Sequence, residues 1–112
     1  MIYHIASAED WNTAQIKGLY KPEGLLRDGF IHCSTVDQFL QVANFYFSER
    51  KGLVALEIDE GLLRAELRWE GQEGYTFPHI YGPLEVSAVV RVAELKPNAK
   101  GLFEFPFERV LH

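Results

Sequence analysis

The chain has 112 residues, a net charge of −5 and an ordinary share of hydrophobic residues, 47%. A chain of this length folds around one hydrophobic core, so we expect one domain spanning residues 1–112. With 11 basic residues against 16 acidic ones, it lacks the basic surface that binds DNA or RNA through phosphate contacts, which excludes nucleic acid as a partner. The single cysteine can form no intramolecular disulfide, and we find no signal peptide and no apolar run of about 20 residues, so we expect a cytoplasmic protein that does not bind membranes.

The first half of the chain predicts two helices, each with a capping residue. One begins after Ser7, whose hydroxyl can cap free backbone N–H groups, and ends at Gly18. The other begins after Thr35, which has the spacing of a capping box with Gln38, and closes at residues 51–52. The remaining predicted elements are strands at residues 2–6 and 30–33 and a helical turn at Leu25-Leu26.

The second half predicts strands separated by turns. Residues 53–58 are almost wholly apolar, which indicates a central strand buried on both faces. Phe103, Phe105 and Phe107 alternate in the tail, which predicts a final strand or an extended strap over residues 101–112. The other predicted strands are residues 67–70, 77–81 and 86–95, with a glycine-rich loop at residues 71–74. This order favours an α+β fold with a mixed or antiparallel sheet and two main helices.

Three of the four histidines, His4, His32 and His79, lie inside short apolar strands. A single histidine in such a setting is usually a structural residue, but three in matching contexts favour a shared site. We therefore predict that these three line one cleft and act as catalytic residues. His112 is at the terminus, where we expect fraying.

Strand alternation adds neighbours to two of these histidines. His32 and Ser34 project to one face, and His79 and Tyr81 share a face, so each pair sets a titratable ring beside a hydroxyl. Such pairs suit substrate orientation and proton transfer. Cys33 projects to the face opposite His32, where a small buried hydrophobic residue is a better interpretation than a nucleophile.

Charged and aromatic residues near the glycine-rich loop complete the set of candidates. Arg68, Trp69 and Glu70 could line a ligand pocket, although Trp69 is also typical of plain core. Glu57 lies within the apolar run and needs a partner if it is buried, which Arg68 or Arg64 could supply.

Two strings in the chain are specific, GFIHCST at residues 29–35 and FPHIYGP at residues 77–83. Together with the helix of Gln38, LEID at residues 56–59 and RWE at residues 68–70, they resemble the bacterial domain-of-unknown-function family 952 (DUF952). The resemblance covers nearly the whole chain, and the family name implies no activity.

A second resemblance is to small ADP-ribosyltransferases, especially the rifamycin-modifying kind. Their first strand carries a histidine in a Tyr/Phe-His-Gly-Thr/Ser context, and residues 3–6, YHIA, are similar but depart at the last two positions. Their second strand carries a tyrosine and runs into a helix through a Thr or Ser cap. Residues 30–35 are similar, with His32 at or near the position of that tyrosine. A late acidic residue completes that family's triad, and His79 replaces it here.

This second resemblance implies an ADP-ribosyltransferase-like fold and NAD or a related nucleotide as ligand. It further implies that His4 holds the NAD ribose, that His32 orients nicotinamide and that His79 serves as acid, base or hydrogen-bond donor. Two alternatives remain open. One is a non-enzymatic binding or structural module with structural histidines, and the other is a three-histidine metal-dependent hydrolase. The histidine spacing contains no local ligand pair, so we expect no bound metal.

Overall fold

The structure, a computed structural model, describes residues 1–108. Three helices accompany three small sheets, and the strand pairs within residues 1–108 are antiparallel. The strands are β1 (Ile2–Ser7), β2 (Leu19–Tyr20), β3 (Ile31–His32), β4 (Leu53–Ile58), β5 (Glu66–Gln72), β6 (Tyr75–Tyr81), β7 (Leu84–Glu85) and β8 (Val89–Leu95). The helices are α1 (Ala8–Lys17), α2 (Glu23–Asp28) and α3 (Val36–Tyr46), with 3-10 turns at Glu60–Leu62 and Val86–Ala88. This arrangement confirms the α+β class.

The largest sheet has the order β1-β4-β8 and divides the core into two clusters. Because alternate residues of a strand project to opposite faces, β1 and β4 each supply side chains to both clusters. One cluster packs beneath α1 and the other beneath α3 and the C-terminal strap, residues 101–108. Their main members are Ile2, Ala6, Trp11, Leu56, Ile58 and Ile80 in the first, and Tyr3, Ile5, Phe39, Leu53, Phe103 and Phe107 in the second. The prediction that residues 53–58 form a central buried strand is confirmed.

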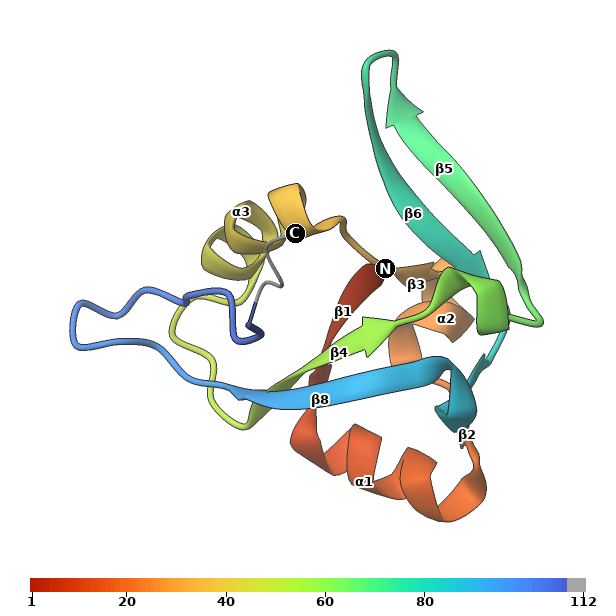
Figure 1. Ribbon diagram of the computed structural model, residues 1–112, viewed down its shortest axis with the longest axis horizontal. Coiled ribbons are helices and arrows are strands. Elements are labelled where there is room, and N and C mark those ends of the chain that lie inside the picture. The colour runs from red at the N-terminus through yellow and green to blue at the C-terminus, as the bar shows by residue number, and fades with distance from the viewer. Residues whose placement is uncertain (109–112) are drawn as a thin grey trace.

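The β5–β6 hairpin extends away from the main sheet and pairs with β3 at its base (Figure 1). The turn is shorter than predicted, because residues 71 and 72 belong to β5. β3 has two residues, Ile31 and His32. Cys33 N–H still donates to the Pro78 carbonyl of β6, and the chain then changes partner, since Ser34 pairs with Tyr3 of β1. Residues 28–34 therefore connect the hairpin to the main sheet.

Both predicted helix starts are confirmed. The Ser7 hydroxyl accepts from the Asp10 backbone N–H, and Gly18 ends α1 with a φ of 83°, a value that favours glycine. Thr35 and Gln38 form the predicted capping box of α3. The helical turn at Leu25-Leu26 is the middle of α2.

Several boundaries differ from those predicted. Residues 86–88 form a 3-10 turn instead of the start of a strand, because the chain there passes from the β2–β7 sheet to β4. The helix after Thr35 ends at Tyr46, several residues before residues 51–52. Residues 101–108 form a strap without regular secondary structure, so the strap alternative holds for this part of the tail, and His112 lies outside the described residues.

Glu57 is buried, but its partner is not Arg64 or Arg68, as predicted, because both lie on another part of the fold. Arg91 of β8, directly opposite in the sheet register, donates from Nε and Nη2 to the two Glu57 oxygens at 2.7 and 2.8 Å. The Tyr3 hydroxyl donates to the same carboxylate at 2.9 Å. These charged hydrogen bonds hold the pKa of Glu57 below its ordinary value, with the Arg91 bonds as the largest cause.

No helix within residues 1–108 is long and apolar enough to cross a membrane.

Candidate functional site: a cleft lined by three histidines

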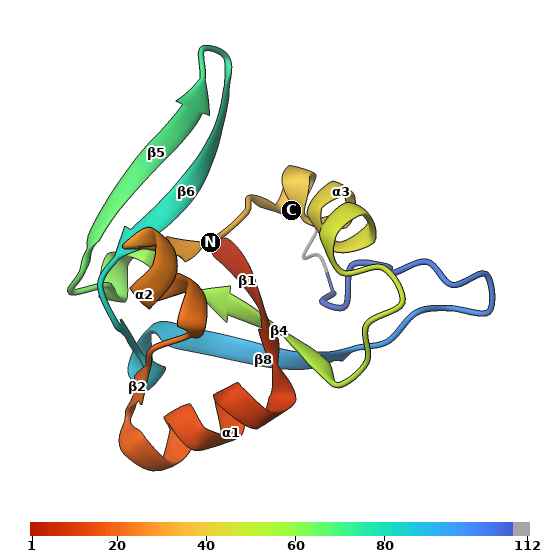
Figure 2. The ribbon, with the colours of Figure 1, turned by 180° about the vertical axis from the view of Figure 1, so that it is seen from behind.

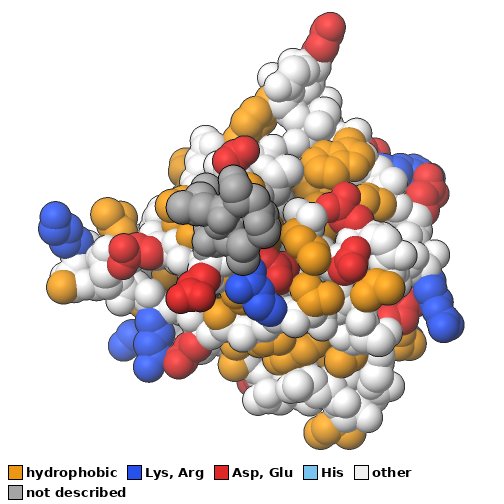
Figure 3. Space-filling view, in the orientation of Figure 1, with side chains coloured by type: hydrophobic (Ala, Val, Ile, Leu, Met, Phe, Trp, Pro, Cys, Tyr) orange, Lys and Arg blue, Asp and Glu red, His pale blue; other side chains and the backbone are white. Residues whose placement is uncertain are grey.

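A cleft of about 630 Å³ lies where β1 and β3 meet, and residues of α2 and α3 contribute to its lining. Figure 2 shows these two helices on opposite sides of β1. His4, His32 and His79 all line the cleft, as predicted from the sequence. The remaining lining residues that matter here are Tyr20, Arg27, Asp28, Cys33, Ser34, Tyr46, Phe47, Arg50 and Phe77. On the face of the molecule seen in Figure 3, acidic and hydrophobic side chains are interspersed, and no histidine is visible outside the area that the grey residues cover.

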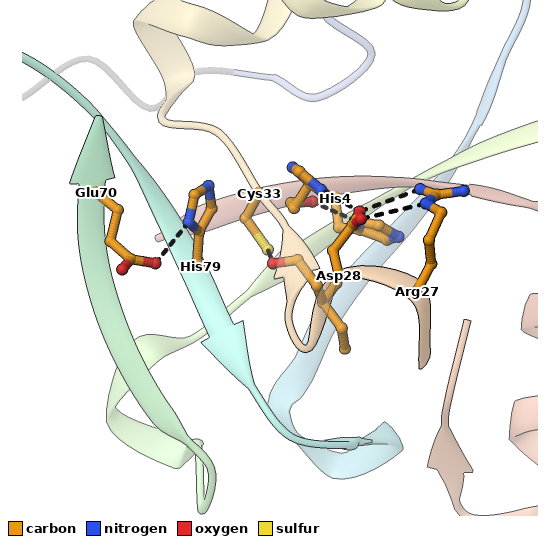
Figure 4. A network of polar contacts seen from close by, with 8 residues as sticks. His4, Arg27, Asp28, Cys33, Glu70 and His79 are labelled. Carbon is orange, nitrogen blue, oxygen red and sulfur yellow. Dashed lines mark hydrogen bonds and ion pairs between the residues drawn. The ribbon is translucent and has the colours of Figure 1, made fainter. Parts of the chain in front are cut away.

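His79 is held by a carboxylate on the neighbouring strand. Its Nδ1 lies 2.9 Å from Glu70 Oε1, and the two side chains reach toward one another from β6 and β5 (Figure 4). The Tyr81 hydroxyl donates to the same oxygen at 2.5 Å. The Tyr81 and His79 hydrogen bonds, in that order, lower the pKa of Glu70, so it is an anion at neutral pH. Phe30 stacks on the His79 ring with centroids 4.0 Å apart, which fixes the plane of the imidazole.

His32 has a carboxylate of its own. Its Nε2 lies 2.9 Å from Asp28 Oδ2, at the end of α2, and Arg27 contacts that same carboxylate at 3.1 Å. The Arg27 hydrogen bond, followed by the one from His32, lowers the pKa of Asp28. The His32 side chain is 58% exposed, so this imidazole is accessible from the cleft.

The two carboxylate-bound imidazoles are neighbours. His32 and His79 are directly opposite in the β3–β6 register, and their ring centroids are 5.4 Å apart. A carboxylate oxygen can only accept, so His79 carries its proton on Nδ1 and His32 on Nε2. Within residues 1–108, neither His79 Nε2 nor His32 Nδ1 has a hydrogen-bond partner. In their neutral forms, both rings offer a basic nitrogen for proton transfer.

His4 differs from the other two because both of its ring nitrogens are occupied. Nδ1 lies 2.6 Å from the His32 carbonyl oxygen, which can only accept, so Nδ1 carries the proton. Nε2 therefore accepts from the Tyr20 hydroxyl at 2.7 Å, and burial, the largest cause, raises the pKa of that tyrosine and keeps it protonated. Burial also lowers the pKa of His4 from 6.5 to about 4, so the ring is neutral at physiological pH.

This lowered pKa makes His4 a source of acid sensitivity. The unfolded chain binds a proton at His4 below about pH 6.5 and the folded chain only below about pH 4, so stability falls as pH drops through that window. From about pH 7.5 to about pH 5 we expect a loss of about 2 kcal/mol from this residue alone. Urea melts at both pH values measure it.

His4→Gln is the matched control for this prediction. Its amide can donate to the His32 carbonyl and accept from Tyr20, but it does not titrate. Asp28, Glu57 and Glu70 have lowered pKa values, so their contributions are lost only below about pH 4.5 and are common to both proteins. An equal acid-induced loss of stability in the wild type and the variant would contradict the assignment.

The remaining residues predicted from the sequence divide into three groups. Ser34 lines the cleft and is buried. Glu70 and Tyr81 lie behind His79, and the Arg68 guanidinium lies 4.2 Å from the centre of the Tyr81 ring, so these three support the site without lining the cleft. Trp69 is 47% exposed and belongs neither to the core nor to the cleft, because strand alternation directs it to the face of β5 opposite Arg68 and Glu70.

Sequence reasoning did not identify Asp28, Tyr20 or Phe30 as part of the site. Asp28 could have been found, since it ends α2 and lies four residues before His32. Tyr20 left no signal, because its contact with His4 depends on the packing of separate segments. Strand alternation predicts that Phe30 shares the face of His32, but not that its ring stacks on His79.

Cys33 is buried beside the cleft, and burial raises the pKa of its thiol. A neutral buried thiol is a poor nucleophile, which agrees with its interpretation as a small hydrophobic residue.

Within residues 1–108, no group of three or more His, Cys, Asp or Glu side chains is placed to hold a metal ion. Because both nitrogens of His4 are engaged, the three histidines do not converge as a ligand set.

Comparisons with known proteins place this geometry in a family. The crystal structure of protein CC0527 from Caulobacter crescentus is 37% identical, with a TM-score of 0.83 and 92% of each chain covered. The solution NMR structure of CC0527 is 38% identical, with a TM-score of 0.77, 90% of this chain and 89% of that chain covered. No functionally curated protein matches the chain. Residues 5–92, from β1 to β8, match the family described as "Protein of unknown function (DUF952)", and the chain belongs to this family.

Proposed function

We propose that the histidine cleft binds NAD or a related phosphorylated nucleotide and that the protein transfers a group from it, as an enzyme with an ADP-ribosyltransferase-like fold and chemistry. The observation that carries this proposal is the convergence of His4, His32 and His79, from three separate strands, on one cleft. Its volume of about 630 Å³ lies within the range of small-molecule sites.

A carboxylate behind His79 supports the comparison with ADP-ribosyltransferases. In those enzymes a late acidic residue stabilises the developing positive charge on the ribose, whereas this chain has His79 in that part of the sequence. Glu70, 2.9 Å from His79 Nδ1, brings a negative charge to the same place from the adjacent strand. The imidazole and the carboxylate together then provide the negative field and the proton acceptor that such a reaction needs.

The roles follow from the free nitrogen atoms. His79 Nε2 takes the proton from the acceptor nucleophile as that nucleophile bonds to the ribose C1′ atom of NAD. The bond from C1′ to the nicotinamide nitrogen breaks, and nicotinamide leaves with the electron pair. His32, which is exposed beside Phe30, orients the nicotinamide ring. His4 holds the His32 backbone through its carbonyl and is a positioning residue, a change from the ribose-binding role first expected.

Ligand binding tests this function directly. We expect NAD to raise the thermal midpoint of the protein in a concentration-dependent way, with a stabilisation of about 2.7 kcal/mol at about 100 times the dissociation constant. His79→Ala should abolish turnover, measured as nicotinamide release, and Glu70→Gln should reduce it by about 100-fold by removing the charge behind the imidazole.

Glu73→Gln is the control, because Glu73 is an exposed carboxylate in the turn of the same hairpin. It should match the wild type in nicotinamide release. If neither NAD nor ADP-ribose shifts the midpoint, the nucleotide proposal is wrong. A shift with zinc alone would favour the metal-dependent alternative, and no shift with any of these ligands would favour the non-enzymatic one.

A further inference from the structure

The side of the cleft formed by α3 has no role in the chemistry proposed above. Four residues line the cleft here, and we call them the α3 wall: Val42, Tyr46, Phe47 and Arg50. Val42 and Tyr46 belong to α3, and Phe47 and Arg50 follow its C-terminal end. Figure 2 shows α3 on the side of β1 opposite α2. The α3 wall thus contains two aromatic side chains and one cationic side chain, a combination that is common in ligand-binding surfaces.

Tyr46 is an aromatic ring without a packing partner on its outer side. It is 68% exposed, although large aromatic residues usually bury most of their surface. Phe45 contacts it edge to face, with ring centroids 4.8 Å apart, so the ring is supported from one side. A supported, exposed aromatic ring at the border of a cleft is a platform on which a nucleobase can stack.

Arg50 is the cation of this wall. Its guanidinium carbon lies 5.1 Å from the centre of the Phe47 ring, and within residues 1–108 it forms no salt bridge. Arg27, across the cleft, is already paired with Asp28. An arginine held on an aromatic ring with its donors unused is suited to bind phosphate, since the planar guanidinium matches two phosphate oxygens.

We infer that the α3 wall is the base-and-phosphate subsite of the cleft, where Tyr46 stacks on a purine base and Arg50 binds the adjacent phosphate. This inference rests on the proposed function and adds the part of the substrate that is recognised: an adenine nucleotide, bound away from the reacting ribose. The histidines then act on one end of the ligand while the α3 wall holds the other. Binding energy from such a remote group positions the reacting atoms.

Isothermal titration of NAD, AMP and adenosine with two variants separates the two contacts. Tyr46→Ala should weaken all three ligands by about tenfold or more, because stacking requires only the base. Arg50→Gln should weaken NAD and AMP by a similar factor but leave adenosine unchanged, because adenosine has no phosphate. Both residues are on the surface, so both variants should keep the urea midpoint of the wild type.

Two controls match these changes outside the cleft. Trp69→Ala removes an exposed aromatic ring from the hairpin outside the cleft, and Lys51→Gln removes the positive charge next to Arg50. Neither should alter affinity. If the wild type binds NAD and both α3-wall variants bind it equally well, the subsite is wrong and the proposed function stands. If the wild type binds none of the three ligands, the proposed function fails and this inference fails with it.

Discussion

Leu56→Ala is expected to lower the free energy of unfolding by about 2–5 kcal/mol, and His32→Ala by less than about 1 kcal/mol. Leu56 is fully buried at the centre of β4, so truncation removes apolar contacts and leaves a cavity. The His32 ring is 58% exposed, and its hydrogen bond to Asp28 lies at the surface, where such pairs contribute little. This difference in the free energy of unfolding distinguishes a core residue, which stabilises the fold, from a site residue, which contributes little to stability.

Urea melts of both variants, compared at equal m-values, measure this difference. Phe39→Ala provides a second core reference, because Phe39 is fully buried against Tyr3 and Phe105 and should cost about 3–5 kcal/mol. If His32→Ala destabilised the protein as much as Leu56→Ala, His32 would be a structural residue, and the enzymatic proposal would lose one of its two imidazoles with an unoccupied ring nitrogen.

Arg91→Met is expected to lower the free energy of unfolding by about 3 kcal/mol at neutral pH. Glu57 is only 5% exposed, so removal of the guanidinium leaves a buried carboxylate that keeps the hydrogen bond from the Tyr3 hydroxyl at 2.9 Å but loses its charged partner. Arg91 also lies over the Phe107 ring at 4.8 Å, so the variant loosens the C-terminal strap as well. The measurement is again a urea melt, made at several pH values.

The pH dependence identifies the cause. In the wild type, the lowered pKa of Glu57 contributes stability above about pH 4.5 that is lost as pH falls through the folded-state pKa. The variant lacks this contribution, so the difference between the two proteins should narrow in acid. Lys96→Met is the control, because it breaks a salt bridge to Glu94 in which both side chains are mostly exposed, and it should cost less than about 0.5 kcal/mol. A constant difference across pH would mean that packing alone explains the loss.

In these predictions, the residues expected to be costly to replace and the site residue His32 lie in separate parts of the molecule. The β1-β4-β8 sheet carries the core and the buried ion pair, whereas His32 and His79 lie on the β3–β6 pair at the base of the hairpin. Ser34 and Tyr3 join the two through paired backbone hydrogen bonds of 2.8 Å. His32 and His79 are therefore attached to the stable sheet without being part of its core, which is why we expect replacement of the exposed His32 ring to cost little stability.

The local features were predictable from the sequence by itself. The Thr35–Gln38 capping box, the apolar run of residues 53–58 and the glycine that ends α1 are all contained within a few neighbouring residues. The three histidines could also be identified as candidate site residues, because each lies within a short apolar segment. The two-residue period of a strand then predicts which neighbours share the face of each histidine. The two specific strings, with the helix of Gln38, LEID at residues 56–59 and RWE at residues 68–70, also carried the resemblance to the family to which the chain belongs.

Only the tertiary structure decided which of these elements meet. The pairing of β3 with β6 sets His32 opposite His79, although 46 residues separate them in the chain, and no local signal specifies that register. The prediction that Arg64 or Arg68 pairs with Glu57 was wrong for the same reason. The actual partner, Arg91, lies 34 residues away in the chain and is brought opposite Glu57 by the β4–β8 register. The orientation of Trp69 and the convergence of α2 and α3 on one cleft likewise depend on packing between distant segments. The sequence determines the chemistry of each side chain. Which side chains become neighbours is determined by long-range strand pairing, whose free energy depends on the whole fold.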